Sequence, residues 1–163
     1  MRPVSSTPQS TPREIQQWSP NDMEQDVNAN LATSSSTSTE VVTKLSPWSV
    51  EDTVARLSAI VAARGLKVFV VVDHSGEAAA VALELRDTKL VIFGSPQAGT
   101  PVMQAAPLAA LDLPLKVLVW LDDHQTKLSY TPPSELATRY HLSEELATRL
   151  AGIHALTDAV IDR

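Results

Sequence analysis

The sequence predicts a domain that mixes strands and helices, because short apolar runs typical of buried strands are interleaved with segments of helical periodicity. Three runs, at 66–72, 88–93 and 115–121, are dense in β-branched and other large apolar residues. A spacing of three and four residues between apolar positions after Ser49 indicates an amphipathic helix. A short polar turn after the third run predicts a hairpin, and therefore antiparallel pairing in at least part of the sheet.

The first half of the predicted domain alternates strand and helix. Val41 to Leu45 is a short β-branched strand. Ser49 is a favourable N-cap with Asp52 in the capping-box position, and Gly65 stands where a left-handed residue would end the helix. The apolar strand 66–72 then runs into a turn at residues 73–76, and an alanine-rich segment at 77–85 predicts a short helix.

The second half adds three strands and three helices. The strand 88–93 is followed by a Gly/Pro loop and a helical segment at 102–111, in which Pro107 should end or kink the helix. The strands 115–121 and 126–130 form the hairpin. A short helix runs from Pro132 to about 140, and Ser143 caps a longer one. One apolar stripe marks that last helix: Leu146, Leu150, Ile153, Leu156 and Val160.

Composition divides the 163-residue chain into a tail and a domain. Residues 1–39 are rich in Ser and Thr and lack apolar periodicity, so we expect a disordered tail; Ile15 and Trp18 could share one helical face that docks onto a partner. Residues 40–163 predict a single globular domain. The chain has no cysteine, which excludes disulfides and thiolate metal sites and suits a reducing compartment.

Charge and hydropathy exclude several partners. The net charge of −6 and the scattered Lys and Arg argue against nucleic acid, whose phosphates require clustered positive charge. No window approaches the roughly 20 apolar residues of a membrane helix, and the first residues lack the apolar segment of a secretory signal. We therefore expect a soluble, cytoplasmic protein without a membrane or nucleic-acid partner.

The loop after strand 88–93 is the first candidate site. Gly94 and Gly99 reproduce the glycine spacing of a phosphate-binding P-loop, but Thr100 stands where Lys is required and Pro101 where Ser or Thr should be. Nucleotide hydrolysis therefore has no support. Free amides near residues 98–100 could hold a small anion, or Gly and Pro could simply shape a tight connection. The candidate ligand-binding residues are Gly94, Ser95, Pro96, Gly99, Thr100, Pro101 and Met103.

The end of strand 66–72 is the second candidate site. Asp73 and His74 could form an acid/base pair in which the carboxylate orients the imidazole, or a plain turn beside a structural histidine. No metal is expected, because the acidic and His residues show no ligand spacing. Ser95 lacks the surroundings of a nucleophilic serine. No cofactor is indicated.

Several separated motifs together resemble the domain-of-unknown-function 302 family. The motifs are Asp73-His74-Ser75, residues 83–86, the loop from Ile92 to Met103, residues 111–117 with Trp120, and Ser129-Tyr130. The resemblance spans residues 40–163. It implies an α+β fold, a two-layer β-α-β(4)-α domain with a curved, mostly antiparallel sheet, helices packed on one face, and homodimers. It brings no settled activity, and Asp87 and His124 depart from the family's pattern.

Three functions remain open from the sequence. The first is a homodimeric module that binds a small ligand, an anion or metabolite, or a protein partner, in one cleft between Asp73-His74 and the loop 94–103. The second is an enzyme in which His74 is the general base, Asp73 orients it, and Thr100 or loop amides stabilise negative charge. The third is a scaffold whose loop packs across a dimer interface.

Overall fold

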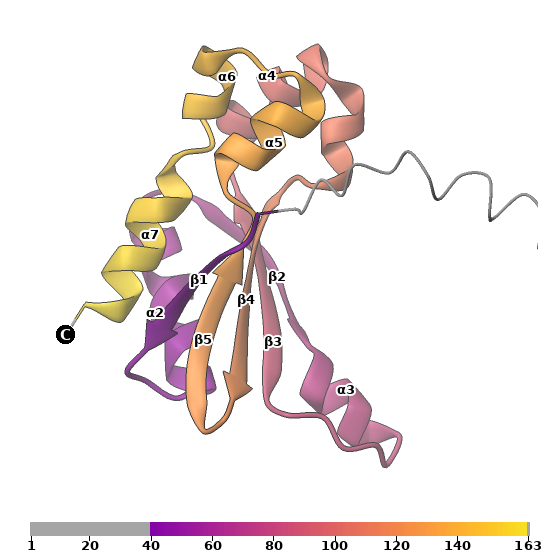
Figure 1. The fold of residues 1–163 in the computed structure, drawn as a ribbon, viewed down its shortest axis with the longest axis vertical. Helices are drawn as coiled ribbons and strands as arrows, with labels where there is room; N and C mark the ends of the chain where they lie inside the picture. The colour runs from indigo at the N-terminus through magenta and orange to yellow at the C-terminus, as the bar shows by residue number, and fades with distance from the viewer. Residues whose placement is uncertain (1–39, 163) are drawn as a thin grey trace, which may run out of the picture. The chain divides into compact units, whose positions relative to one another are not determined.

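A computed structural model describes residues 40–162 of the chain, and the predicted tail at 1–39 lies outside this range. Five strands form one antiparallel sheet in the order β1-β5-β4-β3-β2 (Figure 1). Their bounds are β1 Val42–Ser46, β2 Lys67–Asp73, β3 Thr88–Gly94, β4 Leu115–Asp122 and β5 Gln125–Tyr130. The predicted α+β class and antiparallel sheet are confirmed. The first and second strands are the two edges.

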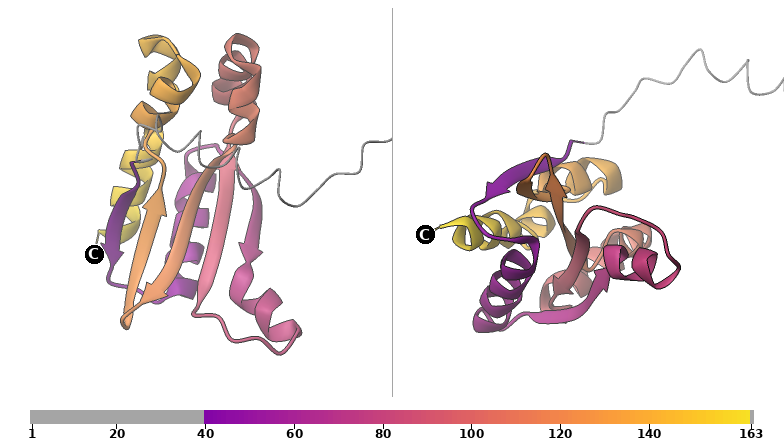
Figure 2. Two further views of the ribbon diagram at one scale, coloured as in Figure 1. Left: turned by 45° about the vertical axis from the view of Figure 1, so that its right-hand side comes forward. Right: turned by 90° about the horizontal axis from the view of Figure 1, so that it is seen from below.

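Helix α2 (Val50–Ala63) covers one face of the sheet together with α7 (Gly152–Ile161) (Figure 2). Ser49 caps α2 as predicted, since its Oγ accepts the amide of Asp52 at 3.0 Å. Gly65 ends the helix with a φ of 71°, a conformation that glycine adopts without strain. The helical stripe therefore lies against the strands and forms the main core.

The main core is built from side chains that alternate along the strands. Val91 and Phe93 of β3 and Val117 and Val119 of β4 are fully buried against the helices. Leu57 of α2 is also fully buried among them. The residues between these positions face the other side, which no helix of the described range covers (Figure 2). The helices that pack on the sheet thus lie on one face.

A second, smaller core lies at one end of the sheet (Figure 1). It comprises α4 (Pro96–Ala105), the 3₁₀ helix η1 (Pro107–Leu111), α5 (Pro133–Tyr140) and α6 (Glu144–Thr148). Its buried residues are Val102, Ala109, Leu136 and Leu150. The helix predicted at 102–111 begins six residues earlier, and Pro107 starts η1, because a proline suits the first position of a helix. We call these four elements the end cluster.

The single long helix predicted after Ser143 is wrong. Ser143 caps α6, but the chain turns between Arg149 and Ala151 before α7 begins. The apolar stripe is divided accordingly, with Leu150 in the end cluster and Ile153 in the main core. The turn lets one stretch of sequence serve two cores.

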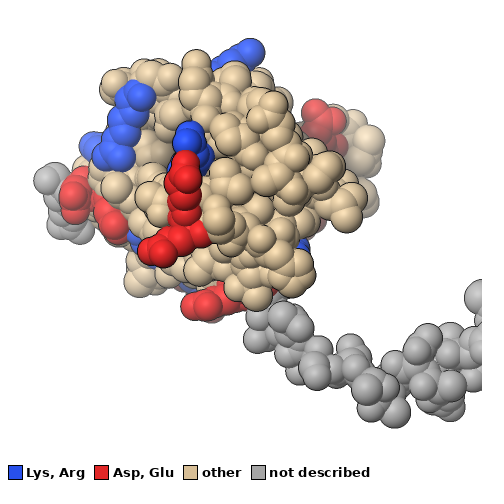
Figure 3. Space-filling model, turned by 90° about the horizontal axis from the view of Figure 1, so that it is seen from above, with Lys and Arg blue, Asp and Glu red and all other residues tan. Residues whose placement is uncertain are grey.

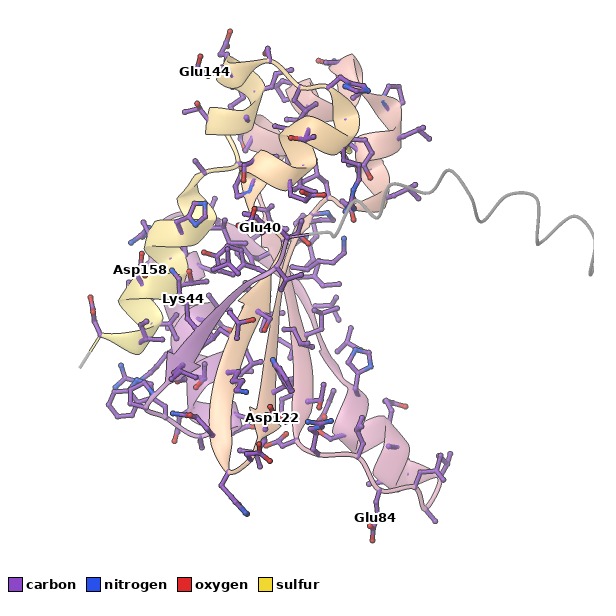
Figure 4. All side chains as sticks on the ribbon, viewed as in Figure 1. Glu40, Lys44, Glu84, Asp122, Glu144 and Asp158 are labelled. Atoms are coloured by element: carbon purple, nitrogen blue, oxygen red, sulfur yellow. The ribbon has the colours of Figure 1, made fainter. Side chains whose placement is uncertain are left out.

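Helix α3 (His74–Ala80) projects from the opposite end of the sheet (Figure 1). It begins three residues before the predicted start, because Asp73 accepts the amide of Gly76 and so acts as the N-cap. None of its residues is buried, and residues 81–86, which lead back to β3, are exposed. We call residues 74–87 the arm; Glu84 lies at its outer tip (Figure 4).

Candidate functional site

The loop between β3 and α4 is a compact helix start. Ser95 is the N-cap, with its Oγ accepting the amide of Ala98 at 3.2 Å, and Pro96 occupies the first helical position. The amide of Gly99 donates to the carbonyl of Ser95 at 3.0 Å. The amides of Ala98 and Gly99 are therefore already hydrogen-bonded, which removes the basis for the predicted anion site.

A wall formed by Leu113 and Pro114 faces this loop. The peptide bond between these two residues is cis. A Cβ added at Gly94 would meet the Cβ of Pro114 at 3.5 Å, and one added at Gly99 would meet Leu113 Cδ1 at 4.0 Å and Met103 Cε at 3.8 Å. Because these two glycines have no side chain, the loop backbone lies close to the wall and a space remains between the loop and the wall.

A cavity of about 340 Å³ occupies that room. Its lining is almost entirely apolar, and the hydroxyls of Ser95 and Thr100 are the side-chain polar groups among the lining residues. No charged residue lines it, and Figure 3 shows uncharged side chains over most of this end of the molecule. The lining residues are Phe69, Gly94, Ser95, Pro96, Ala98, Gly99, Thr100, Met103, Leu113, Pro114, Leu115 and Leu150.

The sequence located most of one side of this cavity. Every predicted ligand-binding residue lines it except Pro101. The predicted list omitted Ala98 of α4 and five residues from β2, the wall, the start of β4 and the turn after α6: Phe69, Leu113, Pro114, Leu115 and Leu150. The apolar residues 113–115 could have indicated a buried or cavity-lining segment. No sequence feature near Phe69 or Leu150 indicated that these residues would lie beside the loop.

Asp73 and His74 lie at the other end of the sheet. In the β2–β3 pair, Asp73 stands opposite Lys89, whereas Gly94 stands opposite Lys67. The strand end and the loop are therefore separated by the full length of β2. The predicted single cleft between them is wrong, and so is the enzyme arrangement that placed His74 beside Thr100. His74 is exposed on the arm.

The Asp73 carboxylate is held by three groups. Its Oδ2 accepts Lys89 Nζ at 2.5 Å, and its Oδ1 accepts the amide of Gly76 at 2.8 Å and Ser75 Oγ at 2.9 Å. The hydrogen bond from Lys89, followed by those from Gly76 and Ser75, lowers the pKa of Asp73 to about 2. A carboxylate so fully engaged anchors the arm and is not poised to exchange protons near neutral pH.

Two other acidic groups in the described part of the chain, Asp122 and Asp158, form ion pairs. Asp122 at the β4–β5 turn binds Arg86 and Lys127 (Figure 4). Lys44 of β1 pairs with Asp158 of α7 at 2.6 Å. Within residues 40–162, no group of three or more His, Cys, Asp or Glu residues converges in a way that could hold a metal ion.

Comparisons with known proteins agree with the fold. A family model described as "Domain of unknown function DUF302" matches residues 42–160. The crystal structure of an uncharacterized conserved protein DUF302 from Bacillus stearothermophilus superposes with a TM-score of 0.63 at 20% identity, covering 75% of this chain and 95% of that one. At this identity the likeness concerns the fold alone.

Two curated relatives carry the name of a channel. Fluoride-specific ion channel FluC 1 of Brucella suis is 40% identical over 103 residues, which is 63% of this chain and 41% of the relative. The protein of the same name from Brucella abortus is also 40% identical, over 38% of its length. The chain thus spans about two fifths of these relatives. Among residues 40–162, no helix has the length and apolarity to cross a membrane.

Proposed function

Because the chain belongs to the DUF302 family, whose description names no activity, its function has to be inferred from the site, and we propose that it binds a small apolar ligand in the cavity beside α4. The observation that carries the proposal is the cavity itself, about 340 Å³ with an apolar lining and two hydroxyls. Ligand sites are commonly of this size and composition, with a few polar groups that orient the ligand.

The chemistry of the lining favours an uncharged ligand. A bound anion would need a cationic side chain or free backbone amides. No cationic side chain lines the cavity, and the amides of Ala98 and Gly99 already donate to Ser95. Thr100 is exposed at the rim, where its hydroxyl could pair with one polar atom of the ligand. We expect a small, mostly apolar molecule, for which indole is a suitable probe.

Methionine labelling gives a direct test. The chain has three Met, at positions 1, 23 and 103, and of these Met103 lines the cavity. Indole added to protein carrying ¹³C-methyl methionine should shift the Met103 methyl signal through its ring current and leave the other two in place. An unchanged Met103 signal at millimolar indole would contradict the proposal.

Two leucine substitutions provide a matched pair for this test. Gly99→Leu directs a side chain toward Met103 and Leu113, so it should fill the cavity and abolish the indole response. Gly152→Leu places the same residue in another helix, where an added Cβ meets nothing within 4 Å. The Gly152 variant should keep the response; equal responses in both variants would place indole elsewhere.

A second candidate function is association with a fluoride channel. Its support is the 40% identity to a segment of proteins named fluoride-specific ion channels. The test uses the Brucella suis protein with its matched segment removed. If the segment assists the channel, fluoride efflux should fall on removal and recover when this chain is supplied separately. Efflux that is unaffected by the removal would argue against this function.

We also propose that the protein is a homodimer. The support is the exposure of several large apolar side chains on β2, at the edge of the sheet. A long apolar strand edge is a site at which further strands add unless it is protected.

A further inference from the structure

We propose that two copies of this chain pair antiparallel along β2, and that the arm of each copy closes the cavity of the other. The inference rests on the proposed function, because it concerns the same cavity. In this arrangement, two exposed apolar surfaces, the β2 edge and the arm, become contacts between the copies. Each ligand site is then formed by residues of both copies.

The first observation is the character of β2. As an edge strand, β2 has one side free of any neighbouring strand in the described residues. Phe69, Val70 and Val71 are exposed in its middle, and the register with β3 is irregular between Val68 and Val70. Of the features that commonly protect an edge strand, this stretch has the register irregularity but no Lys, Glu or Pro, so its exposed apolar side chains stay open to a partner strand.

The second observation is the arm. A seven-residue helix with no buried residue gains little from packing on its own domain. The return segment exposes three large apolar side chains, Val81, Leu83 and Leu85, within five residues. The arm is tied to the sheet at its base, where Ser75 Oγ donates to Asp73 of β2 and accepts the amide of Thr88 of β3. It therefore presents apolar side chains from a fixed position.

The third observation is where these surfaces lie along β2. The arm follows Asp73 at one end of the strand, while the cavity lies beside Lys67 and Gly94 at the other. A two-fold axis through Val70 reverses the strand, so each arm lies beside the cavity of the other copy. Phe69 belongs to both the edge and the cavity lining, which makes the two surfaces continuous.

Charge favours a second copy in this register. Pairing about Val70 sets Lys67 opposite the partner's Asp73, and the reverse pair follows from symmetry. The arm also carries Glu77 and Glu84, while its Arg86 is paired with Asp122 of the same copy. Lys116 lies at the cavity end of β4. Acidic groups on each arm thus approach basic groups of the other copy, and the apolar side chains between them leave water.

Cysteine cross-linking tests the contact directly, because the chain has no cysteine of its own. Leu83→Cys puts one thiol on the arm and Thr100→Cys puts one at the cavity rim. After the two variants exchange subunits under reducing conditions, mild oxidation of the mixture should give covalent dimers. Neither variant alone should do so, since the two-fold axis keeps like positions apart.

A matched exposed position controls for random collision. Leu108 takes the place of Thr100 in this control, because both residues are exposed in the end cluster but Leu108 lies outside the cavity lining. A mixture of Leu83→Cys with Leu108→Cys should give at most a tenth of the covalent dimer obtained with Thr100→Cys. Equal yields of covalent dimer from the two mixtures would overturn the proposed arrangement. Covalent dimers formed by Leu83→Cys alone would also overturn it, because they would show that the two arms contact each other.

Val70→Lys tests the strand pairing. It places two like charges at the proposed axis, so sedimentation should change from twice the chain mass of 17.6 kDa to the chain mass. The control is Val41→Lys, because Val41 is 53% exposed beside the other edge strand and Val70 is 46% exposed. The control should remain dimeric. A wild-type monomer, or a dimer lost only in the control, would refute pairing through β2.

The indole response separates this inference from the proposed function. If each arm roofs a cavity, Leu83→Ser should weaken indole binding about tenfold, because apolar contact is lost. Cross-linking without any Met103 response would support the arm contact and refute ligand binding. A Met103 response of wild-type strength in monomeric Val70→Lys would refute the shared site and leave ligand binding intact.

Discussion

Lys89 reaches across the β2–β3 pair to Asp73 and binds its Oδ2 at 2.5 Å, at the point where the arm leaves the sheet. The same ammonium lies 3.7 Å from Glu51 of α2. Asp73 in turn caps α3 through Gly76. Asp73 therefore anchors the arm to β3, and Lys89 extends this link toward α2.

Asp73→Asn should lower the free energy of unfolding at neutral pH and change its dependence on pH. The pKa of Asp73 is about 2 in the folded protein, below the ordinary 3.8. The carboxylate therefore contributes stability above about pH 4, which is lost as the pH falls toward 2. Urea denaturation of both proteins from pH 7 to 2 should show their difference shrinking over that window.

The control for this experiment is Asp158→Asn. Asp158 pairs with Lys44 but its side chain is largely exposed. Its replacement should cost less at neutral pH. A difference between wild type and Asp73→Asn that is constant from pH 7 to 2 would contradict the role assigned to Asp73.

Ser95→Ala should destabilise the start of α4 and weaken binding in the cavity. The substitution removes the cap on Ala98, which typically costs about 1 kcal/mol of stability. Ser143→Ala removes a similar cap from α6, away from the cavity lining. Thermal unfolding should show a loss of stability in both variants, whereas the Met103 response to indole should weaken only in Ser95→Ala. An equal loss of the indole response in both variants would mean that the Ser95 cap has no specific role in binding.

Tyr140→Phe should raise the pKa of Asp112. Partial burial raises this pKa, but hydrogen bonds from the Tyr140 hydroxyl at 2.6 Å and from Arg139 outweigh it and hold the pKa below its ordinary value. Removing the hydroxyl should also cost about 1–2 kcal/mol, because it donates to a charged acceptor. Carboxyl NMR titration and urea denaturation measure the two effects.

Tyr130→Phe is the comparison for this prediction. Tyr130 is buried in the main core, and its hydroxyl lies 2.8 Å from Nδ1 of the exposed His154. The pKa of Asp112 should be unchanged in this variant. A shift of the same size in both would mean that the titration reports a general change in the fold.

Leu150→Ala and Leu156→Ala should loosen different parts of the molecule. Leu150 is buried in the end cluster and Leu156 in the main core, and each truncation should cost about 2–5 kcal/mol. Hydrogen exchange should accelerate first in α4 to α6 for Leu150→Ala and in α2 and α7 for Leu156→Ala. The same pattern in both variants would show that the two cores open together.

The elements that the sequence predicted well are those with local signals. Continuous apolar runs indicated the strands around Val91 and Val117, and Ser49 and Gly65 bounded α2. Ser95 followed by Pro96 was also a helix-start signal, and it would have placed the start of α4 correctly. Each of these depends on a few neighbouring residues.

The errors arose where distant contacts decide the structure. The stripe from Leu146 to Val160 has continuous helical spacing, and only the presence of two cores reveals the turn after Arg149. The proposed meeting of His74 with Gly94 overlooked a property of antiparallel neighbours, in which the end of one strand lies beside the start of the next. An antiparallel β2–β3 pair already separates those two residues.

Strand β1 is the edge of the sheet opposite β2, so the distance between the two β1 strands measures the width of the proposed dimer. Two five-stranded sheets joined along β2 would form ten strands, and at about 4.8 Å between neighbours the two β1 strands would be roughly 40 Å apart. Dyes attached at residue 41 of each copy would be separated by the whole assembly. Energy transfer between them would therefore gauge whether the sheets have merged edge to edge.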